Sequence, residues 1–167
     1  MSDTEIESVR KTVGRELVAR LYFLPAYEKL ILAPVYRNFE GADYEQGTAE
    51  LVSTRGSIPP EGELGRRARE TLLRCERKDR NLRGQKASEW PAYRESGLKG
   101  IKQFEKACFL VEVTTLPSTI EVEARPPLVE DLHVGGHLPL GADDADLGAL
   151  ILRVMRCCQK LHADHLA

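Results

Sequence analysis

Residues 106–124 have the sequence KACFLVEVTTLPSTIEVEA and carry the clearest strand signal in the chain. In the second half of this stretch, apolar and polar residues alternate from Thr119 to Ala124. A period of two places one set of side chains against a core and the other set in water. The stretch therefore predicts two strands, over 106–114 and 119–124, in a sheet with one wet face.

Two amphipathic helices are predicted outside this strand pair. Apolar residues recur at helical spacing over 64–77, beginning at Leu64, and over 147–161, beginning at Leu147. Such a stripe is typical of a helix that packs one side against a core. The second stripe is the wider one, so we expect the C-terminal helix to be the more deeply buried.

The two predicted helices begin alike, with Glu63-Leu64-Gly65 in one and Asp146-Leu147-Gly148 in the other. An acid suits the positive end of a helix, and a glycine in the first turn lets another backbone come close. Each helix also follows strand-like runs. The sequence predicts an α+β fold in a single domain, residues 1–167, with a largely antiparallel sheet flanked by helices. The similar starts of the two helices are explained by two β-β-α units that share this sheet. An accidental likeness of two amphipathic helices explains them equally well.

The remaining segments give weaker signals. Residues 4–21 fit either a helix or a strand, because apolar residues at helical spacing are interrupted by Gly14. The strand-like run 29–35 contains Pro34, and proline donates no hydrogen bond to a ladder, so we expect an edge or a strand end there. The other polar or glycine- and proline-rich segments are predicted as loops or broken elements, at residues 37–48, 78–103 and 125–142.

The composition of the 167 residues is that of an ordinary globular domain, with 42% hydrophobic and 30% charged residues. A formal net charge of -2 argues against attraction of the whole molecule to nucleic acid or to anionic lipid. The polar start MSDTEIESVRK has no signal-peptide core, and the four cysteines lack the spacing of a disulfide framework. We therefore expect a cytoplasmic protein with reduced thiols and no membrane partner.

Basic residues cluster in one segment. Residues 66–86 hold nine basic and three acidic residues. The basic side chains, which lie on one predicted helix and the loop after it, could bind phosphates. A solvated helix face with Arg66 and Glu70 paired at i, i+4 is the preferred interpretation of the cluster. No aromatic residue in the segment offers a platform for bases to stack on. A nucleic-acid-binding regulator is thus the alternative interpretation.

Acidic residues cluster further along the chain. Residues 112–146 hold eight acidic residues against Arg125 alone. Two carboxylates on one strand could carry out acid–base chemistry or bind a divalent metal. Both need converging partners in a cleft, which a solvent-facing strand does not by itself provide. A surface for a basic partner is the preferred interpretation. The residues predicted to bind that partner are Glu121, Glu123, Glu130, Asp131, Asp143 and Asp144.

The sequence contains no signature of an enzyme or of a cofactor site. It has no nucleophile elbow, phosphate-binding loop, zinc-protease motif or dinucleotide fingerprint. Cys158, His162 and His165 would share a helix face, but their spacing matches no standard zinc site. His133 and His137 flank a Gly-Gly pair and are interpreted as loop histidines. We predict no catalytic residue, no metal and no cofactor.

A sparse pattern over residues 57–160 resembles a known family. It consists of Glu63-Leu64-Gly65, Trp90, Gly97-Leu98-Lys99, Phe104-Glu105-Lys106 and Asp146-Leu147-Gly148. This pattern resembles the immunity proteins of bacterial contact-dependent growth inhibition systems. The resemblance implies a small cytoplasmic antidote, without enzymatic activity, that binds the C-terminal toxin domain of an effector from a sibling cell. Such toxins are often nucleases. A monomer that forms a 1:1 heterodimer with the toxin is expected, and the resemblance assigns no individual contact residue.

Overall fold

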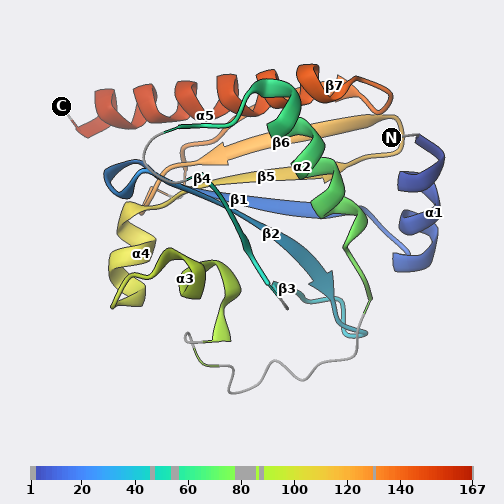
Figure 1. The fold of residues 1–167 in the computed structure, drawn as a ribbon, viewed down its shortest axis with the longest axis horizontal. Helices are drawn as coiled ribbons and strands as arrows, with labels where there is room; N and C mark the ends of the chain where they lie inside the picture. Colours follow the sequence, from blue (N-terminus) through green and yellow to red (C-terminus); the bar gives the residue numbers. More distant parts are fainter. Residues whose placement is uncertain are drawn as a thin grey trace.

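The computed structural model describes residues 3–45, 48–53, 57–77, 86, 89–129 and 131–166. Its strands form a seven-stranded antiparallel sheet in the order β3-β2-β1-β5-β6-β7, with β4 also paired to β2 (Figure 1). The strands are β1 (Val18–Leu24), β2 (Lys29–Arg37), β3 (Asp43–Glu45), β4 (Glu50–Ser53), β5 (Phe109–Thr115), β6 (Thr119–Arg125) and β7 (Val134–Pro139). The helices are α1 (Asp3–Val13), α2 (Glu61–Leu73), α3 (Pro91–Ser96), α4 (Ile101–Ala107) and α5 (Asp144–Leu166), with a 3-10 turn at Pro25–Tyr27.

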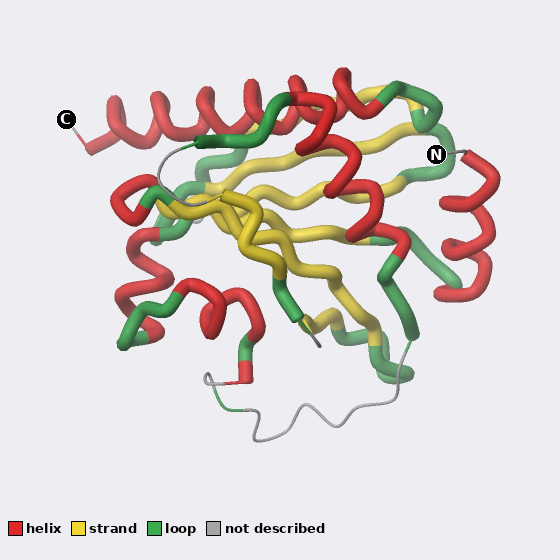
Figure 2. The backbone as a smooth tube through the Cα atoms, in the orientation of Figure 1, coloured by secondary structure: helices red, strands yellow, loops and turns green. Residues whose placement is uncertain are grey.

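One face of the sheet packs against α2 and α5 and forms the main core (Figures 1 and 2). The apolar set of β6 predicted from the alternation faces this core, since Ile120, Val122 and Ala124 are fully buried. Leu147 at the start of the predicted C-terminal stripe is also fully buried. None of the described helices, the 23-residue α5 included, is long and apolar enough to cross a membrane. The predicted α+β class and the largely antiparallel sheet are confirmed.

The helices α2 and α5 approach each other at two glycines. A Cβ atom on Gly65 would overlap the carbonyl oxygen of Asp144, and one on Gly148 would overlap the carbonyl oxygen of Glu61. Each glycine therefore faces the residue four positions before the other glycine. The close approach of a second backbone, which the sequence predicts at these glycines, is confirmed by this reciprocal contact.

The crossing relates two halves of the chain. The hairpin β1–β2 precedes α2, and the hairpin β5–β6 precedes α5. The hairpins meet through their first strands, with Leu21 opposite Val111 in an antiparallel register. Additional strands extend each hairpin at its outer side, β3 and β4 along β2 and β7 along β6. The arrangement matches two β-β-α units that share a sheet, with extra edge strands on both sides.

Two predicted loops contain strands, and the loop predictions are wrong there. Segment 125–142 includes β7, an edge strand paired only with β6. A Cβ on Gly136 would come within 2.8 Å of Leu150 in α5, so glycine allows the helix to lie over this strand. Segment 37–48 includes the short β3. Both strands are short edge elements in which turn-forming residues hide the strand pattern.

Other boundaries also differ from the sequence prediction. Pro34 does not end β2. On the edge of β2 away from β1, pairing with β4 ends at Leu32 and pairing with β3 begins at Val35, so the proline falls in the gap where no donor is needed. Residues 106 and 107, predicted as strand, belong to α4. The ambiguous segment 4–21 divides into α1 and the start of β1.

The helices α3 and α4 pack on the opposite face of the sheet and make a second, smaller apolar cluster over β1 and β2. Glu45 of β3 lies beneath this layer and is 4% exposed. Its carboxylate accepts hydrogen bonds from the Tyr22 hydroxyl, from Trp90 Nε1 at 2.9 Å and from the Ala92 amide at 3.3 Å. Burial raises the pKa of Glu45 above its usual 4.5, and the three donors offset that shift only in part.

The helix crossing predicts opposite effects for two glycine-to-alanine changes in α2. Gly65→Ala should destabilise the fold by about 1–3 kcal/mol or more, since the added methyl group overlaps backbone rather than a movable side chain. Gly62→Ala is the matched control, because nothing lies within 4 Å of the position that its methyl group would take. Gly62→Ala should raise the free energy of unfolding by at most about 1 kcal/mol, because alanine has a higher helix propensity than glycine. Chemical denaturation of both variants measures the difference, and equal effects would contradict the close crossing.

The buried carboxylate predicts a pH effect of known sign. Because the pKa of Glu45 is raised in the folded state, the native chain holds a proton that the unfolded chain releases above pH 4.5. Its contribution to stability is therefore complete below that pH and is lost as the pH rises through the raised pKa. Glu45→Gln should remove this loss, since the amide oxygen can accept from Trp90 and Ala92 while the amide group donates to Tyr22.

Denaturation of the wild type and of Glu45→Gln from pH 4 to pH 8 measures the effect. Glu123→Gln provides a control of opposite sign. Partial burial raises the pKa of Glu123, but hydrogen bonds from Arg125 and His133 outweigh it and lower the pKa overall. Its contribution is therefore lost as the pH falls. A stability difference between Glu45→Gln and wild type that does not vary with pH would contradict the prediction.

Candidate partner-binding surface

The strands β5, β6 and β7 leave one face uncovered, because the main helices lie on the other face and α3 and α4 pack over β1, β2 and β4. We call this surface the open face. Charged side chains dominate it, and Glu121 and Glu123 lie there together, as the alternation in β6 predicts. The side chains of the open face are Arg20, Leu110, Glu112, Thr114, Glu121, Glu123, Arg125, His133 and His137.

The charges of the open face form ion pairs, some between neighbouring strands and one within β6. Arg20 Nε lies 2.9 Å from Glu112, and Arg125 Nε lies 3.2 Å from Glu123. His133 Nδ1 also contacts Glu123, at 2.5 Å. Glu121 has the loosest of these contacts, 3.7 Å from His137 Nε2, and its side chain is 38% exposed. Glu121 is therefore the carboxylate of this face that is most available to an external cation.

A groove of about 710 Å³ opens at the end of this face next to α4. Tyr22, Leu110 and Arg125 form one cross-strand row along its sheet side. Trp90 and Phe104 contribute from the α3–α4 layer, and residues 126–129 contribute from the loop after β6. Most of the lining is apolar and aromatic, while Arg20 and Arg125 supply positive charge. Nothing in the sequence signalled this groove, because it joins segments from three distant parts of the chain.

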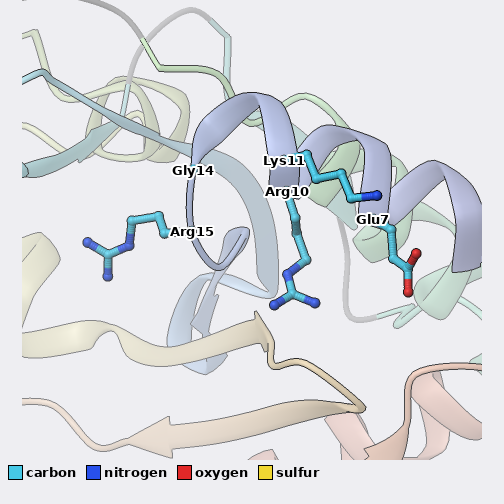
Figure 3. A pocket seen from close by; sticks show the side chains of 5 residues that line it. All are labelled: Glu7, Arg10, Lys11, Gly14 and Arg15. Carbon is cyan, nitrogen blue, oxygen red and sulfur yellow. The ribbon is translucent and has the colours of Figure 1, made fainter.

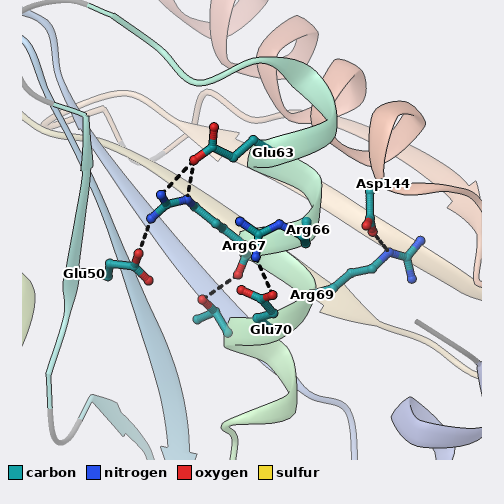
Figure 4. Close-up of polar contacts among 8 residues, drawn as sticks. Glu50, Glu63, Arg66, Arg67, Arg69, Glu70 and Asp144 are labelled. Atoms are coloured by element: carbon teal, nitrogen blue, oxygen red, sulfur yellow. Dashed lines mark hydrogen bonds and ion pairs between the residues drawn. The ribbon is translucent and has the colours of Figure 1, made fainter.

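The six predicted partner-binding residues do not share one surface. Glu121 and Glu123 lie on the open face, and Asp131 is exposed in the loop before β7, whereas Glu130 lies outside the described residues. Asp143 and Asp144 lie at the start of α5, in the helix layer. The Asp143 carboxylate accepts a hydrogen bond from the Asp146 amide at 2.8 Å, as an N-cap does, and Asp144 pairs with Arg69 at 3.0 Å (Figure 4).

Arg69 corrects the expectation of a solvated basic stripe on α2. Its side chain is buried at 2% exposure and points from α2 towards the start of α5 (Figure 4). There it donates to the carbonyl oxygens of Leu140 and Ala142 and pairs with Asp144. The physical reason is position, since Arg69 follows the core residue Ala68 and flanks the apolar stripe of the helix.

The other described arginines of the basic segment have partners within the chain. Arg66 pairs with Glu70 at 2.5 Å, which confirms the predicted i, i+4 pair, and Arg67 bonds Glu63 and Glu50 (Figure 4). Arg74 donates to the Thr48 carbonyl, and Arg77 stacks over Phe39. Lys78, Arg80 and Arg83 lie outside the described residues. The described part of the segment therefore offers little free positive charge for a phosphate backbone.

A second hollow, of about 420 Å³, lies at the C-terminal end of α1 (Figure 3). Glu7, Arg10, Lys11 and Arg15 line it, but Figure 3 shows these side chains pointing in different directions. Arg10 is held by the Leu116 carbonyl at 3.2 Å, and Arg15 by Glu16 at 3.3 Å. The hollow has no convergent set of donors for a ligand.

The groups considered for metal or thiol chemistry are placed as follows. Among the described residues, no cluster of three histidine, cysteine or acidic side chains is arranged to hold a metal ion. Cys158 is fully buried, and the His162 ring packs edge-on against Phe109, while the His165 side chain lies outside the described residues. Burial raises the pKa of the Cys75 and Cys158 thiols to about 11, which keeps them protonated near neutral pH.

No protein-family model matches the chain, and no curated protein matches it significantly. Solved structures do share its architecture. A protein of unknown function from Neisseria meningitidis aligns with a TM-score of 0.66 and 11% identity, over 86% of this chain and 96% of that chain. A chain of the CdiA-CT/CdiI toxin and immunity complex from Yersinia pseudotuberculosis aligns with a TM-score of 0.61 and 10% identity, over 86% of this chain and 97% of that chain. At such low identity, the likeness shows that the fold is shared.

Proposed function

We propose that this protein is an immunity protein that binds and neutralises the C-terminal toxin domain of a contact-dependent growth inhibition effector. The observation that carries the proposal is the fold shared with a chain of a toxin and immunity complex, nearly over the full length of that chain. The sequence pattern over residues 57–160 supports the same family independently of the fold. The protein acts by covering its partner and catalyses no reaction.

The open face is the surface that suits a protein partner best. The opposite face of the sheet is used by α2 and α5, so it is closed to any partner. The open face combines partly exposed carboxylates with an apolar groove, and stable interfaces pair an apolar centre with a polar rim. An interface of standard size, on the order of 1,600 Å², would give a 1:1 complex of nanomolar affinity or better.

A nuclease is the toxin class that this surface fits. A nuclease binds the phosphate backbone of its substrate with basic side chains, and an acidic surface is complementary to such a site. Glu121 and Glu123 project from one strand on the same side, and Asp131 follows in the loop before β7. Glu121 and Glu123 are the principal contact residues in this proposal. Asp143 and Asp144 contribute less, because both lie at the start of α5, in the layer on the other side of the sheet.

The test is the binding of the C-terminal domain encoded by the gene immediately upstream of this one. Co-expression of the two chains should protect a cell from that domain, and the purified chains should form a 1:1 complex. Glu121→Lys with Glu123→Lys should slow association about tenfold or more at low salt, because the reversed charges repel a basic partner. The difference should shrink as salt screens the charges, which stopped-flow kinetics at two salt concentrations measures.

The control must change the net charge equally while leaving the open face intact. Glu70→Lys with Asp164→Lys meets this requirement, since both side chains are exposed on the helices of the opposite layer. Reversal of Arg69 would be unsuitable, because that side chain is buried against the start of α5. Equal slowing by both double variants would show that only net charge matters and would contradict binding through the open face. Failure of the wild-type chain to bind or protect would contradict the proposed function itself.

A further inference from the structure

The loop after β6 exposes a leucine in an unfavourable backbone conformation. Leu128 is 69% exposed, more than any other exposed large hydrophobic residue of the described chain. Its φ of 60° lies in the left-handed region, which residues other than glycine, asparagine and aspartate seldom adopt. In a turn, the position after a proline with positive φ normally holds glycine or asparagine. Leu128 stands there directly after Pro127.

Neither the core nor the backbone of the free chain accounts for a leucine at this position. Its side chain gains little from burial, and its backbone is strained relative to glycine. The residue therefore fits a role outside the isolated fold. Strained residues and exposed apolar groups are both frequent where proteins contact ligands or partners.

The position of Leu128 connects it with the open face. Residues 126–129, which we call the ridge, form one side of the groove. The ridge begins directly after Arg125, which is bound to Glu123 at 3.2 Å. Pro126 is buried and anchors the base of the ridge, while two consecutive prolines restrict its backbone. A backbone that is already ordered loses little conformational entropy on binding, so the residue it presents can add more to affinity than one on a mobile loop.

We infer that Leu128 is an anchor residue of the interface, inserted from the ridge into an apolar pocket of the partner. This inference rests on the proposed function and specifies the partner further. The pocket must accept an aliphatic side chain, and the groups around it must complement Arg125 directly before the ridge and Asp131 shortly after it. Truncation of such an anchor chiefly speeds dissociation, whereas the carboxylates of the open face act on association.

Two substitutions test the anchor with the upstream-encoded domain as the probe. Leu128→Ala removes the side chain and keeps the strain, and Leu128→Gly removes both. Both should raise the dissociation rate about tenfold or more with little change in the association rate. Leu128→Gly should leave the thermal midpoint unchanged or raise it. Leu161→Ala is the matched control, since Leu161 is 41% exposed on α5, and it should leave both rates unchanged.

The outcomes separate this inference from the proposed function. Wild-type dissociation rates in both Leu128 variants, together with slow association of Glu121→Lys with Glu123→Lys, would overturn the anchor and leave the function standing. A large fall in thermal stability of Leu128→Gly would show that the residue serves the fold, which also overturns the inference. No binding by the wild-type chain would overturn both proposals.

Discussion

The contact of α2 with α5 at Gly65 and Gly148 is the constraint on which the rest of the structure depends. Two helices can lie this close over one sheet only where neither carries a side chain at the crossing. Their closeness brings Arg69 of α2 to the segment between β7 and α5, where it bonds two carbonyl oxygens and Asp144. The edge strand β7 is thereby joined to both helices, and its other face is left to solvent.

The two faces of the sheet consequently have different tasks. The face under α2 and α5 is apolar and buried throughout, so it supplies most of the stability. The other face is divided between the α3–α4 layer, fixed by the buried Glu45, and the charged surface over β5, β6 and β7. The groove lies at the boundary between these two parts and borders the ridge with Leu128. An apolar centre next to paired charges is the usual composition of a protein interface.

Much of this fold follows from local sequence patterns, and the candidate surface follows only in part. Alternation in β6 and the stripe of α5 are strong signals, because a single periodicity is maintained over the whole element. The strand β7 is not predictable this way, since Gly136 is required by the helix lying over it rather than by local preference. Likewise, Arg69 follows the pattern of an exposed residue, and only the helix crossing explains its burial. The alternation in β6 predicts that Glu121 and Glu123 share a face. Arg20 reaches the same face only because β1 pairs with β5, which lies far from it in the sequence, and there it contacts Glu112.

The pairing of β1 with β5 at the centre of the sheet has a consequence for the order of events during synthesis. Leu21 meets Val111, so the middle of the sheet joins segments made far apart in time. The first half of the chain, once translated, holds the hairpin β1–β2 but still lacks the strand β5 that pairs with β1 and the helix α5 that packs against α2. Contacts between such distant residues form slowly, and an incomplete sheet exposes its edges meanwhile. Nearly the whole chain must therefore leave the ribosome before the sheet and its helix layer can be completed, which sets a minimum delay between the start of synthesis and the appearance of the folded protein.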